Sequence, residues 1–233
     1  MPRFISHQSL IGKDRKGLNA EQKSFARKDD DQTSLLDVVK KYEPTILIGV
    51  TAVGGLFTEN VVREMASRVE RPIIFPLSNP TVKAECTASQ AYDWTDGRCV
   101  FASGSPFNPV EMDDGRIFYP SQCNNMYIFP GLGLGATLCG ATKVTDRMLY
   151  VAAEALAKFV SPEELERGVV FPSLNSIRAV SHRIAVAVIK EAMRDGLATK
   201  VTHKDAQDLN SFVSRKMYFP EYVPLVEKRE ITI

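Results

Sequence analysis

Residues 46–102 contain three short apolar runs, ILIGV at 46–50, IIFPL at 73–77 and CVFA at 99–102. The runs begin 27 and 26 residues apart, at Ile46, Ile73 and Cys99. This spacing is typical of βαβ units, in which a helix returns the chain to a neighbouring parallel strand. Because the runs are apolar throughout, we expect helices to cover both faces of the sheet. The sequence therefore predicts an α/β fold built on a doubly wound parallel sheet.

Helix signals lie before and between the runs. Ser34 is placed to cap an apolar helical pattern, Thr58 precedes a second such pattern, and Thr87 with Gln90 forms a capping box. After the third run, Asp114 and Gly115 form the turn signal of a hairpin over 110–119. The remaining chain is predicted to be largely helical, over 132–141, 145–160, a turn starting at 161, and 176–194.

Two domains are expected from this pattern. Residues 1–142 would form an α/β domain, with a charged loop at 13–31. Residues 143–233 would form a helical extension that packs on this domain.

Composition narrows the possible partners. The chain has 233 residues, 44% of them apolar, and a formal net charge of +1. A near-neutral balance is not typical of proteins that bind nucleic acid or anionic membranes. No apolar run is long enough to cross a bilayer, and residues 1–10 do not resemble a signal peptide. We expect a soluble intracellular protein, in the cytoplasm or in mitochondria.

Cysteine and histidine positions do not predict a metal site. The four cysteines stand 13, 24 and 16 residues apart, without a Cys-x-x-Cys pair, and are interpreted as buried thiols. The three histidines do not have metal-ligand spacing relative to one another. The cysteines are Cys86, Cys99, Cys123 and Cys139, and the histidines are His7, His182 and His203.

Small polar residues follow each apolar run, at 51–55, 78–81 and 103–106. The carboxyl ends of parallel strands lie along one edge of a sheet, and ligands bind there in open α/β folds. The three loops therefore favour a nucleotide or small polar substrate over a protein partner, the alternative being that they are tight turns. By contrast, GLGLGA at 131–136 matches a phosphate-loop pattern but follows no strand, so we interpret its glycines as helix-packing positions.

Other polar residues have two possible interpretations. Asn124 and Asn125 could orient a small carboxylic acid through their amide groups, or could cap a helix or form an Asx-turn. The charged residues near the loops are interpreted as surface or turn residues. They are Lys83, Glu85, Glu111, Asp113 and Asp114.

Four motifs resemble the cofactor-binding domain of malic enzymes. They are IGVTAVGG at 48–55, RPIIFPLSNPT at 71–81 with KAEC at 83–86, FASGSPF at 101–107 and NNMYIFPG at 124–131. The resemblance implies a Rossmann-type fold, in which 1–142 form a dinucleotide-binding domain that is incomplete at its N-terminal end. It implies oxidation of L-malate with NAD or NADP. It also implies decarboxylation to pyruvate and CO₂ with the help of Mg²⁺ or Mn²⁺.

The resemblance also assigns site residues. Asn79 and Asn125 would bind the carboxyl and hydroxyl groups of malate or pyruvate. The residues expected beside the cofactor are Val50, Thr51, Ala52, Ser78, Asn79, Ser103, Gly104 and Asn124. Gln22 stands where NADP-specific members often have Lys, which favours NAD, and Ser6 stands where the family often has an acidic residue for the adenosine ribose.

Several functional residues of malic enzymes have no counterpart in this chain, judging from the same resemblance. The general base Lys, the general acid Tyr, the malate-binding Arg, the metal-binding carboxylates and the glycine-rich phosphate loop all precede the matched region. We therefore assign no catalytic and no metal-binding residue, and expect the chain alone to be inactive. The alternative is a non-catalytic assembly module that forms homo-oligomers or docks on a full-length subunit.

Overall fold

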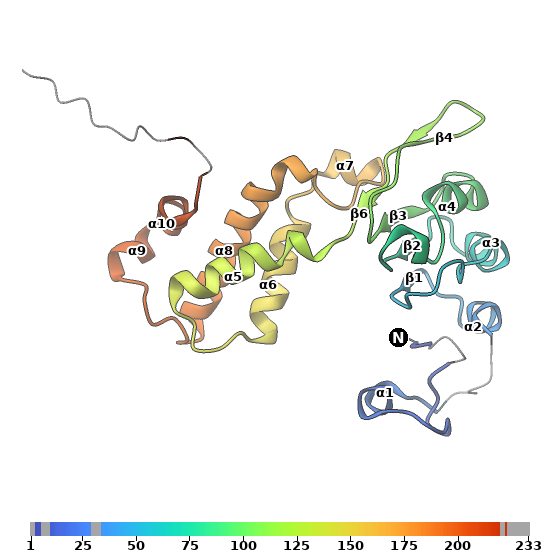
Figure 1. Cartoon of the computed structure of the whole chain (residues 1–233), viewed down its shortest axis with the longest axis horizontal. Coiled ribbons are helices and arrows are strands. Elements are labelled where there is room, and N and C mark those ends of the chain that lie inside the picture. Colours follow the sequence, from blue (N-terminus) through green and yellow to red (C-terminus); the bar gives the residue numbers. More distant parts are fainter. Residues whose placement is uncertain (1–2, 6–9, 29–33, 220–221, 223–233) are drawn as a thin grey trace, which may run out of the picture. The chain divides into compact units, whose positions relative to one another are not determined.

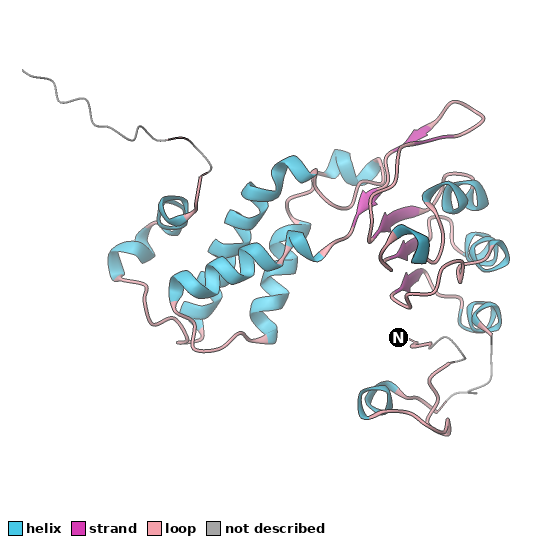
Figure 2. Cartoon of the chain, in the orientation of Figure 1, coloured by secondary structure: helices cyan, strands magenta, loops and turns pink. Residues whose placement is uncertain are grey.

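The computed structural model describes residues 3–5, 10–28, 34–219 and 222, and divides into two compact units. Figure 1 shows the order of the elements, and Figure 2 their types. Unit 1 comprises 1–127 with 156–177, and unit 2 comprises 128–155 with 178–233. The domain boundary expected after residue 142 stays a prediction.

A parallel sheet forms the centre of unit 1. It consists of β1 (Ile46–Gly49), β2 (Ile73–Pro76), β3 (Val100–Ser103) and β6 (Ser121–Gln122), in the order β1-β2-β3-β6. All three pairings are parallel, with Ile46 opposite Ile73 and Ile73 opposite Val100. The predicted parallel α/β sheet is confirmed, whereas β6 is too short and polar to have been predicted.

Three helices cover one face of this sheet (Figure 1). They are α2 (Leu35–Tyr42), α3 (Glu59–Arg68) and α4 (Ala88–Thr95). Ser34 and Thr87 accept hydrogen bonds from the backbone three residues on, as predicted, whereas Thr58 makes no side-chain cap. The core between helices and sheet includes Val39, Leu47, Val62, Met65, Ile74 and Phe101.

The opposite face of β1 is exposed, which corrects the expectation of cover on both faces. Leu47 points into the core, whereas Ile46 is 49% exposed and Ile48 is 56% exposed. Alternate residues of a strand point to opposite faces, so helices on one side leave every second residue of β1 uncovered. A continuous apolar run could not predict this exposed face, because the run shows that a strand is hydrophobic but not which of its two faces is covered by a helix.

Two local predictions have different outcomes. The hairpin is confirmed by the antiparallel strands β4 (Val110–Glu111) and β5 (Ile117–Phe118), with Gly115 at a φ of 83° in the turn. The segment 13–31 is not a loop throughout, because helix α1 (Ala20–Phe25) forms within it. Asn19 and Gln22 form a reciprocal capping box that starts this helix.

Short helical elements complete unit 1. Residues 81–83 and 125–127 form the 3₁₀ turns η1 and η2, and 174–176 form η3. Helix α7 (Pro162–Glu166) begins at Ser161, whose hydroxyl accepts from Glu164 N as the sequence predicts. Tyr127 is buried and donates a hydrogen bond to the carbonyl of Pro172 at 2.6 Å.

Unit 2 is helical. Its elements include α5 (Phe129–Cys139), most of α6 (Asp146–Ala157), α8 (Ile177–Arg194), α9 (His203–Gln207) and α10 (Leu209–Lys216). A Cβ on Gly131 would stand 2.7 Å from Ile184 Cβ, and one on Gly135 would stand 2.8 Å from the carbonyl oxygen of Ala185. These glycines therefore let α5 approach α8 closely, as predicted for GLGLGA. None of the described helices is long and apolar enough to cross a membrane.

Candidate functional site

The loops that follow β1 and β2 are joined by one buried carboxylate. Glu85 has no exposed surface, and its Oε1 accepts hydrogen bonds from Thr51 N at 3.0 Å and Thr51 Oγ1 at 2.7 Å. Ser78 Oγ donates to the same oxygen at 2.5 Å, and Ser78 N donates to Oε2 at 3.4 Å. Glu85 thereby fixes the carboxyl ends of two neighbouring strands relative to each other.

This carboxylate corrects the sequence interpretation of Glu85 as a surface charge. Burial alone would raise the pKa of Glu85, but the hydrogen bonds from Ser78 and Thr51 outweigh burial and hold the pKa below its ordinary value of 4.5. Glu85 is therefore ionised at neutral pH. The sequence contained one signal for its burial, because Glu85 stands between two apolar residues, Ala84 and Cys86, that are themselves buried.

The loop after β1 turns sharply over this network. Ala52 has a φ of 57°, in the left-handed region, and its N–H donates to Ser78 Oγ at 2.9 Å. Ser78 Oγ thus donates to Glu85 and accepts from Ala52, so its hydroxyl links the loop after β1 to the buried carboxylate. Val50 is 75% exposed at the start of the same loop. Val50 and Ala52 of this loop are therefore exposed, whereas Ser78, which bonds to it, is buried.

The loop after β3 approaches the loop after β2 at Gly104. A Cβ on Gly104 would stand 2.8 Å from both the carbonyl carbon of Leu77 and Nδ2 of Asn79. Ser105 donates a hydrogen bond to Oδ1 of Asn79. The hydroxyl of Ser103 is directed within its own loop, where it donates to the carbonyl of Ser105 at 2.9 Å. Only glycine fits at 104, because any side chain would collide with the neighbouring backbone.

The two predicted asparagine sites differ in their contacts. Asn124 Nδ2 donates to the carbonyl of Gly104 at 3.3 Å, and Asn124 Oδ1 accepts from Met126 N at 3.1 Å. The second bond is the Asx-turn that the sequence left open. Asn125 is exposed at the start of η2, and its side chain makes no hydrogen bond to the residues that the structure describes. The side chains of Asn79 and Asn124 therefore both lie next to Gly104, in the loop after β3. Asn125 follows Asn124 in the chain.

The described acidic, histidine and cysteine side chains do not gather into a metal-binding cluster. Among the described residues, no group of three His, Cys, Asp or Glu side chains is arranged to hold a metal ion. The four cysteines are free, and all except Cys123 are buried. Burial raises the pKa of Cys99 to about 11 and raises that of Cys86 well above its usual range. These thiols are therefore uncharged packing groups at neutral pH.

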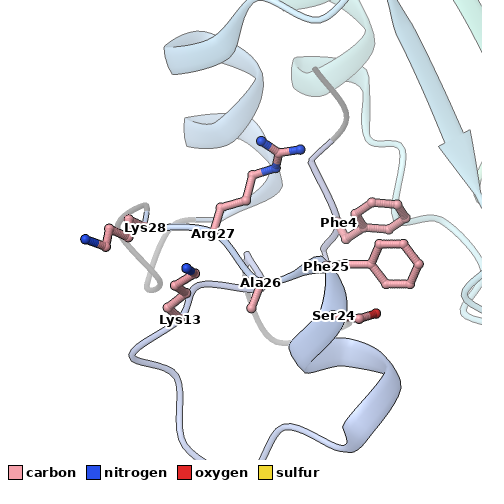
Figure 3. A pocket seen from close by; sticks show the side chains of 7 residues that line it. All are labelled: Phe4, Lys13, Ser24, Phe25, Ala26, Arg27 and Lys28. Carbon is pink, nitrogen blue, oxygen red and sulfur yellow. The ribbon is translucent and has the colours of Figure 1, made fainter.

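A separate cavity of about 440 Å³ lies around the end of α1 (Figure 3). The rings of Phe4 and Phe25 lie side by side with their centroids 4.5 Å apart, and Lys13 and Lys28 lie at the other end in Figure 3. Ser24, Ala26 and Arg27 complete the lining. None of these residues is among the predicted site residues. Gln22 instead caps α1, and Ser6 lies outside the described residues.

Comparison with protein families and curated proteins gives consistent matches. The family model described as "Malic enzyme, NAD binding domain" matches residues 3–193. The chain is 49% identical over 222 residues to the NADP-dependent malic enzyme of Dictyostelium discoideum, and 44% identical over 219 residues to that of Mus musculus. Each alignment covers 94% of this chain but only 40% and 38% of the respective relative. The chain thus spans about two fifths of the length of these relatives.

Solved structures show the same fold. A malic enzyme from Entamoeba histolytica matches with a TM-score of 0.71 at 21% identity, over 91% of this chain and 41% of that one. A malic enzyme from Pyrococcus horikoshii matches with a TM-score of 0.66 at 27% identity, over 89% of this chain and 43% of that one.

Proposed function

This chain belongs to the malic enzyme family as its NAD-binding domain, and from that premise we propose that the loops at the carboxyl ends of β1, β2 and β3 bind NAD or NADP. In the whole protein, this binding would serve the oxidative decarboxylation of L-malate to pyruvate and CO₂. The observation that carries the proposal is the network of Glu85, Thr51 and Ser78, which fixes two of these loops.

The loops suit a planar group such as the nicotinamide ring. Val50 and Ala52 offer exposed apolar surface, and the lack of a side chain at Gly104 leaves backbone approachable. Thr51 and Ser78 hold this surface in place through Glu85, and Ser103 supports the third loop. When bound, the nicotinamide ring accepts the hydride removed from malate. The role of these residues is to bind and orient the ring.

Asn79 and Asn125 would bind the substrate. Asn79 Oδ1 accepts from Ser105, which leaves the Nδ2 group facing the Gly104 loop as a hydrogen-bond donor. Neutral amide donors orient a carboxylate without competing for a cation. Asn124 would contact the cofactor side of the same loop, which it positions through the carbonyl of Gly104. The described residues contain no group of acidic, histidine or cysteine side chains that fits a divalent cation.

The cavity of Figure 3 bears on the choice between NAD and NADP. Lys13, Arg27 and Lys28 provide positive charge beside two aromatic rings that are tilted against each other, which suits the 2′-phosphate of NADP. The relatives from D. discoideum and M. musculus are NADP-dependent. Gln22, whose identity favours NAD, has its side chain in the cap of α1. We therefore propose that either NAD or NADP binds, and that the basic side chains of this cavity would contact the 2′-phosphate of NADP.

Ligand-observed NMR with the chain, NAD, NADP and malate tests the proposal. We expect Asn79→Ala to weaken malate binding in the presence of cofactor by about tenfold, as expected when one or two hydrogen bonds to a charged group are lost. Asn60→Ala, on the exposed start of α3, is the matched control and should change nothing. Failure of the unaltered chain to bind either cofactor at millimolar concentration would refute the proposed function.

The second candidate function is a non-catalytic assembly module that docks on a full-length subunit. The exposed apolar face of β1, with Ile46 and Ile48, favours this alternative because such a face is typical of an interaction surface. Co-purification with a full-length malic enzyme subunit, without cofactor binding by the chain, would support the module. We propose that the chain alone does not turn over malate, and a standard assay for NAD(P)H formation tests this.

A further inference from the structure

Glu85 brings a buried negative charge to the two loops that it joins. Three of its four hydrogen bonds end on Oε1, from Thr51 N, Thr51 Oγ1 and Ser78 Oγ. The fourth, from Ser78 N to Oε2, is long at 3.4 Å. Burying a carboxylate costs far more than burying an amide. The hydrogen bonds stabilise the charged form of Glu85, and this charge can act on groups beyond the loops' own hydrogen bonds.

The negative charge is not neutralised by a described cation. Each hydrogen-bond partner of Glu85 is an uncharged hydroxyl or backbone N–H. Within the part of the chain that the structure describes, no Lys or Arg forms an ion pair with this carboxylate. A buried charge without a counter-charge acts on its surroundings through a medium of low dielectric constant. Its field therefore extends to groups beyond its own hydrogen-bond partners.

The field acts on the proposed nicotinamide surface. Thr51 and Ser78, which contact the carboxylate, belong to the loops that end β1 and β2. Val50 and Ala52 in the first of these loops are exposed. Thr51, which contacts the buried charge, is therefore flanked by two residues that are exposed at the carboxyl ends of the strands, where ligands of such sheets bind.

Resting on the proposed function, we propose that Glu85 makes this site prefer the oxidised cofactor over the reduced one. The nicotinamide ring of NAD⁺ or NADP⁺ carries a positive charge, and the ring of NADH or NADPH is neutral. The phosphates and adenosine are the same in both forms, so a buried anion beneath the ring distinguishes them by that one charge. Glu85 is then a specificity-determining residue that acts through space.

Binding of three ligands distinguishes this electrostatic role of Glu85 from a purely structural role. NAD⁺ carries the charged ring, NADH carries the neutral ring, and ADP-ribose has no ring. We expect Glu85→Gln to weaken NAD⁺ binding about fivefold, while NADH and ADP-ribose binding changes less than twofold, as for loss of a single partly screened charge interaction. Glu85→Asp keeps the charge and should keep most of the preference. Asp113→Asn removes one charge from the exposed hairpin and should leave all three affinities unchanged.

A second measurement needs no substitution. Coupling between two sites is reciprocal, so a cationic ring that is favoured by the carboxylate must lower the pKa of that carboxylate. Carboxyl ¹³C NMR of Glu85 in the unaltered chain should show a lower pKa with NAD⁺ bound than with ADP-ribose bound. This measurement tests the proposal even where Glu85→Gln does not fold.

The outcomes that contradict the proposal are distinct from failure of the proposed function. Equal weakening of all three ligands in Glu85→Gln, or equal pKa values of Glu85 with NAD⁺ and ADP-ribose, would overturn the inference and leave cofactor binding intact. Binding of none of the three ligands to the unaltered chain would overturn the proposed function, and the inference with it.

Discussion

Glu85 lies directly against the backbone of Gly49, the last residue of β1. A Cβ on Gly49 would stand 2.7 Å from both Cγ and Oε2 of Glu85, closer than real Cβ atoms approach other groups. The carboxylate therefore occupies the space that a side chain at position 49 would need. The strand must end in glycine because a buried charge lies beside it.

Gly49→Ala should destabilise unit 1 by about 3 kcal/mol, because Glu85 is held by four hydrogen bonds and cannot move aside without breaking them. Urea denaturation of Gly49→Ala, Glu85→Ala and the double variant measures the coupling. In the double variant the collision is gone, so its loss of stability should be smaller than the sum of the two single losses. Strict additivity would contradict the described contact.

Stability should depend on the ionisation of Glu85 at acidic pH. The folded state holds the pKa of Glu85 below its ordinary value of 4.5, so the unfolded chain takes up a proton first as the pH falls. The stabilisation is thus complete above about pH 5 and is lost as the pH falls through the folded pKa. The difference in Tm between the unaltered chain and Glu85→Gln should shrink from pH 6 to pH 3.5. Parallel Tm curves would contradict this prediction.

Two glycines of α5, Gly131 and Gly133, should change the stability of the protein in opposite directions when replaced by alanine. Gly131→Ala places a Cβ 2.7 Å from the carbonyl oxygen of Ser181 on α8, and should cost about 2 kcal/mol of unfolding free energy. Gly133→Ala meets nothing within 4 Å and should stabilise the helix by up to about 1 kcal/mol. Thermal denaturation followed by circular dichroism measures both. Equal effects would mean that the glycines do not serve α5–α8 packing.

The exposed face of β1 should promote self-association. Ile48 is 56% exposed on a strand at the edge of the sheet, and such strands pair readily with other chains. We expect Ile48→Lys to shift the chain toward the monomer in analytical ultracentrifugation, without loss of Tm. Leu47→Lys, whose side chain faces the core, should instead unfold unit 1. An unchanged sedimentation profile for Ile48→Lys would count against this role of the face.

Cys123 should be the first thiol to react with alkylating reagents. It is half-buried, whereas Cys86, Cys99 and Cys139 are buried. Burial also raises the pKa of Cys99 to about 11, so little reactive thiolate is present at pH 8. Mass spectrometry of the chain after brief treatment with iodoacetamide should find the label on Cys123. Equal labelling of Cys99 would show that unit 1 opens on that timescale.

The strands and most helices could be predicted because their signals are local. Apolar runs, the Thr87–Gln90 capping box and the Asp114-Gly115 turn each lie within a few residues, and the structure contains all of them. Helix α1 was missed since its capping residues, Asn19 and Gln22, stand among charges that suggested a loop. Strand β6 has two residues, too few for a periodic pattern.

The network of Glu85 could not be predicted from the sequence because one of its two partner residues, Thr51, is distant. Thr51 is 34 residues away, and only the parallel pairing of β1 with β2 brings it to the carboxylate. The predicted loops around Thr51, Ser78 and Gly104 are correctly located at the carboxyl ends of strands. Their ligand contacts stay predictions.

The hydrophobic cluster between the sheet and its helices is drawn from a single continuous stretch. Its buried members run from Val39 to Phe101, and the consecutive strands β1, β2 and β3 are neighbours in the sheet. Contacts between residues close in the sequence favour rapid folding, since little loop entropy is lost before they form. We expect this stretch to fold while residues beyond 103 are still emerging from the ribosome. The carboxyl ends of β1, β2 and β3 would then be in place before the helices of unit 2 have been made.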